Sequence, residues 1–220
     1  MELRICEIYR SIQGETSRVG LPATLIRLAG CNLSCRWCDT PEAAGRAETL
    51  TVPEILRRAG ELAGLTAASD GGHFLVTGGE PLLQPAVPEL LGGLLATGRE
   101  VLLETNGSLP IAGIDRRVVR ILDLKAPGSG MVERIHWENV AELTPRDEVK
   151  LVLADRADYE WARRTLADHR LAERCLVLLS PAHGLLDPRE LVAWTLADRL
   201  PVRVQLQLHK QIWGATSRGV

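Results

Sequence analysis

Hydrophobic and polar residues follow two rhythms along this chain. Short apolar runs typical of buried strands are separated by stretches in which apolar residues recur every three to four positions. In the segment Val52–Leu62 this spacing predicts a helix, with Pro53 in its first turn. The predicted strands are Leu3–Tyr9, Ala23–Leu28, His73–Thr77, Glu100–Glu104, Val118–Leu124, Glu148–Leu153, Cys175–Ser180 and Val202–Leu208. The predicted helices are Val52–Leu62, Pro85–Leu95, Tyr159–His169 and Pro188–Leu200.

This alternation of strand and helix predicts an α/β fold. The unit recurs about six times and polar motifs follow the predicted strands, which is typical of a (β/α) barrel. We therefore expect an incomplete (β/α) barrel, with a doubly wound open sheet as the alternative. We expect residues 1–220 to form a single domain, because the chain shows no repeat and no linker.

Composition removes several classes of function. The formal net charge is −2, so no overall basic field indicates nucleic-acid or membrane binding. No run approaches 18 consecutive apolar residues, as a membrane span requires. The 5 cysteines are an odd number and follow no apolar signal segment, which argues against a secreted disulfide scaffold. We expect a cytoplasmic protein with reduced thiols.

Three of the cysteines lie within eight residues of one another, at Cys31, Cys35 and Cys38. Thiolates at this density bind metal. A structural zinc site requires four ligands, whereas three thiolates on a four-iron cluster leave one iron open to a small molecule. Three ordinary cysteines, or a zinc knuckle with a distant fourth ligand, are the alternatives. The spacing C-x3-C-x2-C resembles the signature of the radical S-adenosylmethionine (SAM) superfamily.

Directly after a predicted strand comes Gly78-Gly79-Glu80-Pro81. Two glycines let a ligand approach the backbone closely and expose N–H groups. A carboxylate at Glu80 can pair with an ammonium group. A tight turn before a helix is the alternative. About forty residues after the cysteines, the segment resembles the superfamily motif that holds the SAM amino group.

Polar residues also end the next two strands. Thr105 and Asn106 can hydrogen-bond ribose hydroxyls or a carboxylate, although Asn-Gly is also a strong hairpin signal. Asp123 and Lys125 point to the same side of a strand. Lysine is scarce in this chain, so Lys125 at a strand end suits carboxylate binding, and Lys150 is a weaker candidate. Surface ion pairs are the alternative.

The segment before the cysteines offers a further set of polar groups. Gln13 has amide donors and an acceptor, whereas Glu15 only accepts. Together with Gly14 they follow Ser11-Ile12, and the pair can read the amide edge and amino group of a pterin or purine. Arg27, on the strand that enters the cysteine loop, can pair bidentately with a carboxylate. A solvated loop and an edge-strand charge are the alternatives.

The last predicted strand carries Gln205, Gln207 and His209, which alternation places on one face. That face lines a pocket if the strand closes the barrel interior, and is exposed to solvent if it does not.

Taken in order, these motifs resemble the 7-carboxy-7-deazaguanine synthase family, a radical SAM family of the queuosine and deazapurine pathway. The resemblance runs from residue 9 to 214 and rests on SIQGE, the cysteines followed by Asp39-Thr40, GGEP, ETNG, DLK and the C-terminal QLHKQIWG. It implies a carbon–nitrogen lyase that contracts the ring of 6-carboxy-5,6,7,8-tetrahydropterin to 7-carboxy-7-deazaguanine with loss of ammonia. It also implies a 4Fe-4S cluster, SAM and Mg²⁺ as cofactors, flavodoxin or ferredoxin as reductant, and a homodimer.

Carried over residue by residue, the resemblance assigns four sets of site residues. The cluster ligands are Cys31, Cys35 and Cys38, and Thr40 is the magnesium ligand. The SAM site comprises Gly78, Gly79, Glu80, Thr105, Asn106, Asp123 and Lys125. The substrate contacts are Gln13, Gly14, Glu15, Arg27, Gln207 and His209. The family often carries an aromatic residue in the stretch from 41 to 50, where this chain is rich in Ala and Gly.

Three other functions compete with this one. An activase of a glycyl radical enzyme shares the C-x3-C-x2-C loop, but it does not predict SIQGE. A non-enzymatic iron–sulfur carrier usually has four cysteines. A zinc-stabilised binding module is the third.

Overall fold

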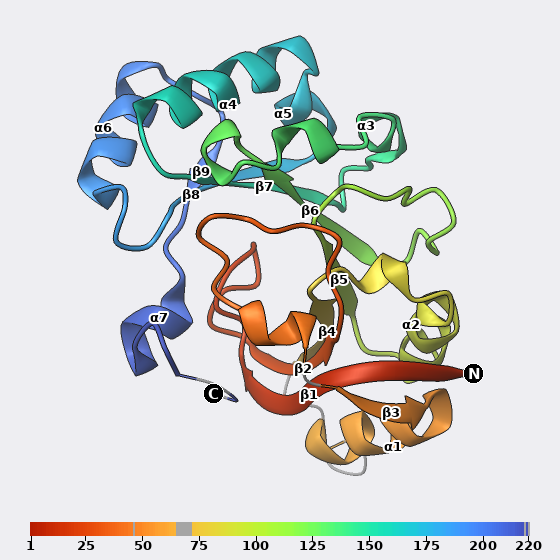
Figure 1. Cartoon of the computed structure of the whole chain (residues 1–220). Coiled ribbons are helices and arrows are strands. Elements are labelled where there is room, and N and C mark those ends of the chain that lie inside the picture. The colour runs from red at the N-terminus through yellow and green to blue at the C-terminus, as the bar shows by residue number, and fades with distance from the viewer. Residues whose placement is uncertain (46, 65–71, 218, 220) are drawn as a thin grey trace.

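Parallel strands make up most of one continuous sheet (Figure 1). The computed structural model describes residues 1–45, 47–64, 72–217 and 219. These residues form a nine-stranded sheet in the order β3-β1-β2-β4-β5-β6-β7-β8-β9. The strands are β1 (Glu2–Ile12), β2 (Pro22–Leu28), β3 (Glu48–Thr51), β4 (His73–Gly78), β5 (Val101–Thr105), β6 (Val119–Lys125), β7 (Glu148–Leu153), β8 (Leu176–Pro181) and β9 (Arg203–Val204).

Chain direction differs between the two ends of the sheet. From β2 through β9 every neighbouring pair is parallel. At the other end β1 runs antiparallel to both β2 and β3. The carboxyl ends of the parallel strands therefore lie at one edge, where their polar motifs meet.

Helices cover one face of this sheet. The α-helices are α1 (Val52–Leu62), α2 (Val87–Leu95), α3 (Asn139–Glu142), α4 (Arg156–Asp168), α5 (Leu171–Arg174), α6 (Pro188–Ala197) and α7 (Leu208–Trp213). Short 3₁₀ helices are η1 (Pro41–Ala44), η2 (Pro81–Leu83), η3 (Pro127–Ser129) and η4 (Val132–Arg134). Helices α1 and α2 pack on the same faces of β2, β4 and β5, and α4 and α6 continue this layer over β6, β7 and β8.

The other face of the sheet is concave and has a small core of its own. Its buried apolar residues, joined by Tyr9, are Ala23, Leu25, Leu75, Leu102, Val119 and Ile121. A doubly wound sheet carries helices on both faces, whereas here the inner face is lined by side chains as in a barrel. The fold is thus the predicted incomplete (β/α) barrel.

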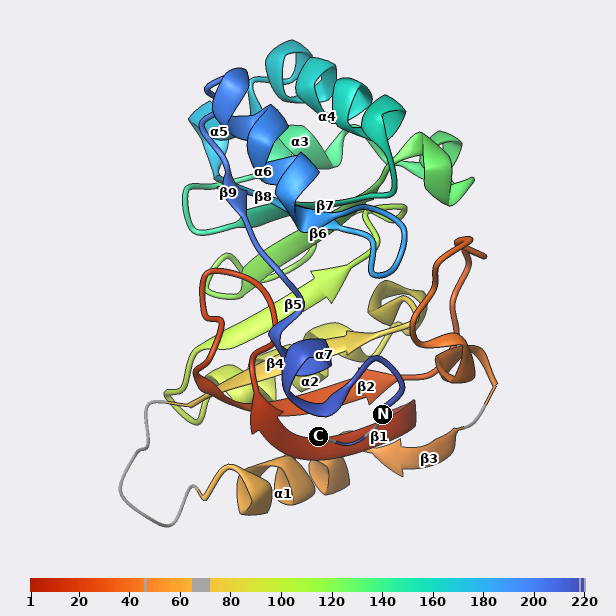
Figure 2. The ribbon, with the colours of Figure 1, turned by 90° about the vertical axis from the view of Figure 1, so that its left-hand side faces the viewer.

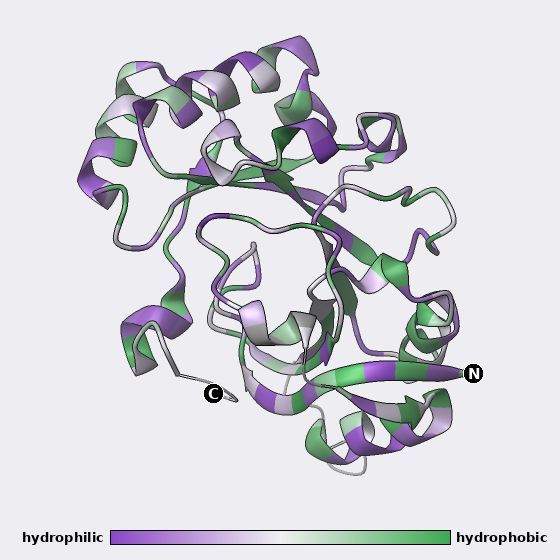
Figure 3. Cartoon of the chain, viewed as in Figure 1, coloured by the Kyte–Doolittle hydropathy of each residue, from purple (hydrophilic) through white to green (hydrophobic). Residues whose placement is uncertain are grey.

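Hydropathy follows this arrangement (Figure 3). The central strands are mostly hydrophobic, as expected for parallel strands covered on both faces. Helix α4 alternates hydrophobic and hydrophilic residues, and its buried side chains include Tyr159, Ala162 and Leu166. Among the described residues no helix is long and apolar enough to span a bilayer.

The predicted terminal strand Val202–Leu208 is wrong over most of its length. Only Arg203–Val204 pair with β8, and Gln205 N–H still donates to the Leu179 carbonyl. The chain then turns away and forms α7 from Leu208 to Trp213. Figure 2 shows this segment running down the open side of the sheet to α7. Gln205, Gln207 and His209 therefore do not share one strand face.

Candidate functional site

The cysteine loop is built directly against the Gly78-Gly79 turn. Glu80 N–H donates to the Gly30 carbonyl at 2.8 Å, and Gly79 N–H donates to the Leu28 carbonyl at 3.2 Å. A Cβ on Gly79 would lie 2.3 Å from the Gly30 oxygen and 2.7 Å from Cys31 Cβ. Both glycines are needed for this close approach, since a Cβ on Gly78 would lie 2.4 Å from the Leu28 oxygen.

The three cysteines lie on one loop beyond the carboxyl ends of β2 and β4 (Figure 2). Cys31 and Cys38 are exposed and Cys35 is half-buried. Within the described ranges, no three His, Cys, Asp or Glu side chains are gathered as metal ligands. The chemistry of the three cysteines fits an iron–sulfur cluster, because all three donors are thiols. By contrast, Cys175 is buried.

Glu80 ties together two strand ends instead of presenting a free carboxylate. It is fully buried, and its oxygens accept from Leu82 N–H at 2.9 Å and from Asn106 N–H at 2.7 Å. Thr105 Oγ1 donates to both oxygens, at 2.8 and 2.9 Å. Burial raises the pKa of Glu80, against these hydrogen bonds. The pairing of Glu80 with an ammonium group stays a prediction, in addition to the three donors that the carboxylate already binds.

Asn106 connects the buried Glu80 carboxylate to the cysteine loop. Its Nδ2 donates to Asn32 Oδ1 at 3.0 Å and lies 3.9 Å from Cys31 Sγ. Asn32 Nδ2 in turn donates to Ser108 Oγ at 2.8 Å. The predicted Asn-Gly turn after β5 thus reaches the first cysteine.

A second group of charged residues lies on the concave face. Lys150 Nζ is 2.8 Å from Glu15 Oε2 and 3.3 Å from Asp123 Oδ2, and it also pairs with Glu104. Asp123 is shared with Lys125, at 2.9 Å. Lys150 is 4% exposed, so this charge-paired cluster is inside the protein. It joins β5, β6 and β7 to the loop after β1.

Mutual pairing sets the ionisation of this cluster. Burial alone would lower the pKa of Lys150, but the three carboxylates around it raise that pKa well above the ordinary value. Burial raises the pKa of Glu104, although Lys150 opposes this. Burial would also raise the pKa of Asp123, yet Lys125 and Lys150 hold it below its usual range.

The loop that carries Gln13 and Glu15 is anchored at the amino ends of the strands. Arg18 lies 2.7 Å from carboxylate oxygens of both Glu100, just before β5, and Glu148, the first residue of β7. Gln205 Oε1 accepts from Thr16 N–H at 2.9 Å, and Thr16 has a φ of 72°. These contacts hold Gln13 and Glu15 inside the barrel, where they are 4% and 8% exposed.

Helix α7 closes over the same loop. Leu208 N–H donates to the Gly14 carbonyl at 2.9 Å, and a Cβ on Gly14 would lie 2.1 Å from His209 Nδ1. A side chain at position 14 would therefore displace the His209 ring. Burial lowers the pKa of His209.

A third link joins α7 to the residues after the last cysteine. Lys210 Nζ lies 2.8 Å from Asp39 Oδ2, and Gln207 Nε2 donates to the same oxygen at 3.3 Å. Thr40 Oγ1 donates to Asp39 Oδ1 at 3.0 Å. Gln207 thus contacts Asp39, the neighbour of the predicted magnesium ligand Thr40, from the residue before α7 and not from a strand.

Arg27 faces the concave side but is held by neighbours on β1. Its Nε donates to Glu7 Oε1 at 2.7 Å and its Nη2 to Tyr9 Oη at 3.4 Å. Burial opposes the charge, yet Glu7 and Tyr9 raise the pKa of Arg27 further, so it is a fixed cation.

Reading the sequence alone missed Glu104, Asp39 and Lys210 as members of this site. Glu104 stands within the recognised ETNG, and its place at the end of a strand was a usable signal. Asp39 and Lys210 are 171 residues apart, and no local pattern pairs them.

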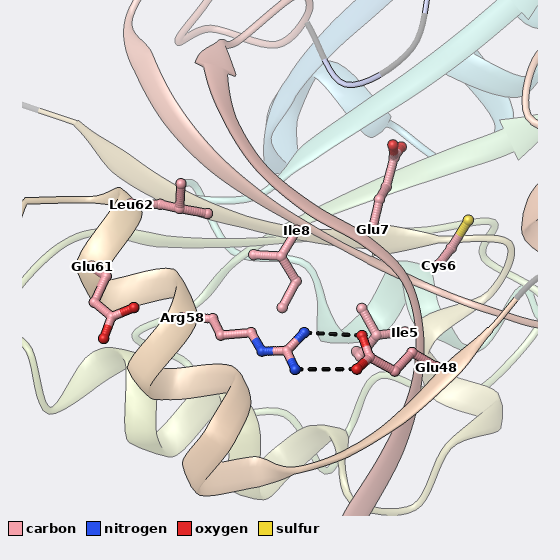
Figure 4. A pocket seen from close by; sticks show the side chains of 8 residues that line it. All are labelled: Ile5, Cys6, Glu7, Ile8, Glu48, Arg58, Glu61 and Leu62. Carbon is pink, nitrogen blue, oxygen red and sulfur yellow. Dashed lines mark hydrogen bonds and ion pairs between the residues drawn. The ribbon is translucent and has the colours of Figure 1, made fainter.

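A separate groove of about 420 Å³ lies on the side of β1 that faces α1 (Figure 4). Arg58 of α1 pairs there with Glu48 of β3 at 2.9 Å, whereas Glu7 points away from α1. None of the predicted site residues lines this groove.

Known proteins resemble this chain over its whole length. The chain is 44% identical to the 7-carboxy-7-deazaguanine synthase of Chlorobaculum tepidum, over 99% of this chain and 97% of that protein. It is 42% identical to that of Koribacter versatilis, over 99% of this chain and 100% of that protein. The chain belongs to the 7-carboxy-7-deazaguanine synthase family. The Radical SAM superfamily profile matches residues 25–127, from β2 to just after β6.

Among solved structures, QueE from Escherichia coli superposes with a TM-score of 0.73 at 22% identity, covering 95% of each chain. This likeness supports the fold. Membership in the radical SAM superfamily implies a 4Fe-4S cluster and SAM for this synthase family member.

Proposed function

We propose that this protein converts 6-carboxy-5,6,7,8-tetrahydropterin to 7-carboxy-7-deazaguanine with release of ammonia. The observation that carries the proposal is identity of 44% to a synthase of this name, over nearly the full length of both chains. The joining of the cysteine loop, the glycine turn and the buried charged cluster at one face of the barrel supports it.

Cys31, Cys35 and Cys38 would hold the cluster at the carboxyl edge of the barrel. Together with SAM, a bound 4Fe-4S cluster supplies the reducing electron and the radical that begins the ring contraction. The protein residues bind, orient and enclose the reactants around it.

For SAM, the backbone of Gly78 and Gly79 and the polar ends of β5 and β6 form the proposed site. Glu80 holds Asn106 N–H and the Thr105 hydroxyl in place and, in this proposal, also binds the SAM amino group. Lys125 supplies a positive charge for a carboxylate, oriented by Asp123 at 2.9 Å.

For the pterin, the proposed contacts are Gln13, Gly14, Glu15, Arg27, Gln207 and His209. Gln13 Nε2 and Glu15 Oε1 are buried without a hydrogen-bond partner among the described residues. A buried donor or acceptor without a hydrogen bond costs stability, so a ligand whose edge binds both groups is favoured. Arg27, already a fixed cation, suits the carboxylate of the substrate.

Thr40 is the proposed magnesium ligand. Mg²⁺ prefers oxygen ligands and keeps several waters, and the Thr40 hydroxyl lies beside the Asp39 carboxylate. A flavodoxin or ferredoxin as reductant and a homodimer follow from the family resemblance and belong to the same proposal. A cytoplasmic location, expected from the cysteine content, belongs to it as well.

Anaerobic reconstitution tests the function. The protein, loaded with iron and sulfide and given SAM, reductant, Mg²⁺ and 6-carboxytetrahydropterin, should yield a product of the mass of 7-carboxy-7-deazaguanine. SAM should not be consumed stoichiometrically. One 5′-deoxyadenosine per turnover would indicate a different radical SAM reaction, and a reconstituted cluster whose spectrum SAM does not change would favour an electron carrier.

Variants of the cysteines test the cluster. Cys35→Ala should lose most bound iron and all turnover, because each cluster thiolate is required. Cys175→Ala is the matched control, since Cys175 is buried under α5, where burial raises the pKa of its thiol to about 12. Full iron loading in Cys35→Ala would contradict the assignment.

A further inference from the structure

Lys150 lies where the two halves of the site meet, yet it belongs to neither proposed ligand set. Its ammonium contacts Glu15 from the loop after β1, Glu104 from the end of β5 and Asp123 from β6. We propose that Lys150 is a positioning residue that holds Glu15 in its substrate-binding orientation. The inference rests on the proposed function and deepens it.

The SAM side and the substrate side of the site depend on Lys150 to different degrees. Asp123 has Lys125 as a second and nearer cation, at 2.9 Å against 3.3 Å. Among the described residues, Glu15 and Glu104 pair with Lys150 and with no other Lys or Arg. Removal of the Lys150 ammonium therefore leaves Asp123, on the SAM side, paired with Lys125. It leaves Glu15 and Glu104, on the substrate side, without a Lys or Arg partner among the described residues.

The backbone pairing of the two remaining carboxylates also differs. Glu104 is part of β5, which pairs on both sides with parallel strands. Glu15 lies on a loop, beside a residue with positive φ. Two like charges that face one another in a buried site repel, so the loop carboxylate moves first. The oxygen displaced is Glu15 Oε1, which the proposed function reserves for the substrate.

The chain provides a control that separates positioning from structural support. Arg120 is also a buried cation of this sheet, 1% exposed, and its Nε donates to Asp147 Oδ1 at 3.0 Å. It points to the opposite, helix-covered face, because it alternates with Val119 and Ile121 of the concave core. Arg120→Met should lower stability without a selective effect on substrate.

The test is a steady-state and binding comparison of five proteins: parent, Lys150→Met, Glu15→Gln, the double variant and the control Arg120→Met. In Lys150→Met we expect the KM for the tetrahydropterin to rise about ten- to hundred-fold, as loss of a charge-assisted contact predicts. The fall in kcat should be smaller than the rise in KM, and the Kd of SAM should change less than about two-fold. Arg120→Met should leave this KM within about two-fold of the parent.

The double variant decides whether Lys150 acts through Glu15. It also remains informative if Lys150→Met folds poorly, because removing both charges leaves a smaller imbalance. If Lys150 positions Glu15, the double variant should match Glu15→Gln in KM within about three-fold. Multiplied effects of the two changes would overturn the inference.

An unchanged KM in Lys150→Met, or an equal loss of SAM affinity, would overturn it too. A parent protein that turns over no tetrahydropterin overturns the proposed function and this inference with it. A parent that does so, with a KM independent of Lys150, overturns the inference alone.

Discussion

Replacement of Glu80 separates two roles for the GGEP motif. If the carboxylate only pairs with a ligand, Glu80→Ala should weaken SAM binding and leave the free protein intact. The structure predicts that the free protein is itself destabilised, because both oxygens already accept hydrogen bonds from Leu82, Thr105 and Asn106.

The magnitude follows from the groups left behind. The Thr105 hydroxyl can rotate to another acceptor, but the Leu82 and Asn106 N–H groups are fixed in the backbone. Each buried donor without a partner costs about 1–3 kcal/mol, so Glu80→Ala should lower the free energy of unfolding by roughly 2–6 kcal/mol. Glu80→Gln keeps one acceptor oxygen and should lose less.

Urea unfolding of the protein without SAM measures this loss, and equilibrium titration measures SAM affinity. Glu61→Ala is the matched control, since Glu61 is an exposed α1 residue paired with Arg57 at 2.8 Å. That control should change stability by less than about 0.5 kcal/mol. The reasoning is refuted if Glu80→Ala unfolds like the parent while its SAM affinity falls, because Glu80 would then act on the ligand alone.

Three further variants test other parts of the structure. His73 is 3% exposed, and burial lowers its pKa from 6.5 to about 4. The folded state then binds fewer protons than the unfolded state in this window, so stability present above pH 6.5 falls as pH drops toward 4, by about 3 kcal/mol in all. In His73→Leu this part of the stability loss at acid pH should vanish. Curves of stability against pH that run parallel for the parent and the variant would contradict this prediction. Gly79→Ala should reduce iron loading because its Cβ would meet the Gly30 carbonyl at 2.3 Å, whereas Gly92→Ala, with nothing within 4 Å, should load normally; equal loading would show that the close approach is dispensable. Thr40→Val keeps the side-chain shape and removes the oxygen, so magnesium should no longer stimulate turnover; stimulation equal to the parent would exclude Thr40 as the ligand.

Local sequence patterns predicted most elements because their causes are local. The helix Val52–Leu62 and the strand Glu148–Leu153 have the predicted bounds. Thr51 caps the first by accepting from Glu54 N–H, a signal that lies within the sequence. The four-residue strand β3 was missed because it depends on pairing with β1 more than on any pattern of its own.

The C-terminal segment shows where local reasoning stops. Its alternation of Val, Leu and polar residues predicts a strand, yet the chain leaves the sheet after Val204. The contacts that redirect it come from the loop after β1: Thr16 N–H binds the Gln205 side chain and Gly14 accepts from Leu208 N–H. These partners are nearly the whole chain apart, so no window of sequence contains both. The same holds for Glu80, whose hydrogen-bond partners Thr105 and Asn106 lie 25 and 26 residues further along the chain.

The scarcity of lysine in this chain is a strong signal for the residues of the site. Of the 26 Lys and Arg residues, Lys125, Lys150 and Lys210 are the lysines, and each pairs with a carboxylate of the site. Several arginines instead bind one carboxylate with two nitrogens, as Arg120 does with Asp147. A planar guanidinium suits such a fork, whereas an ammonium is compact and has three donors that can point to three partners. Only the second geometry serves a point where Glu15, Glu104 and Asp123 converge from three different elements. At Lys150, therefore, a lysine in an arginine-rich chain marks the point where one cation is shared by three carboxylates.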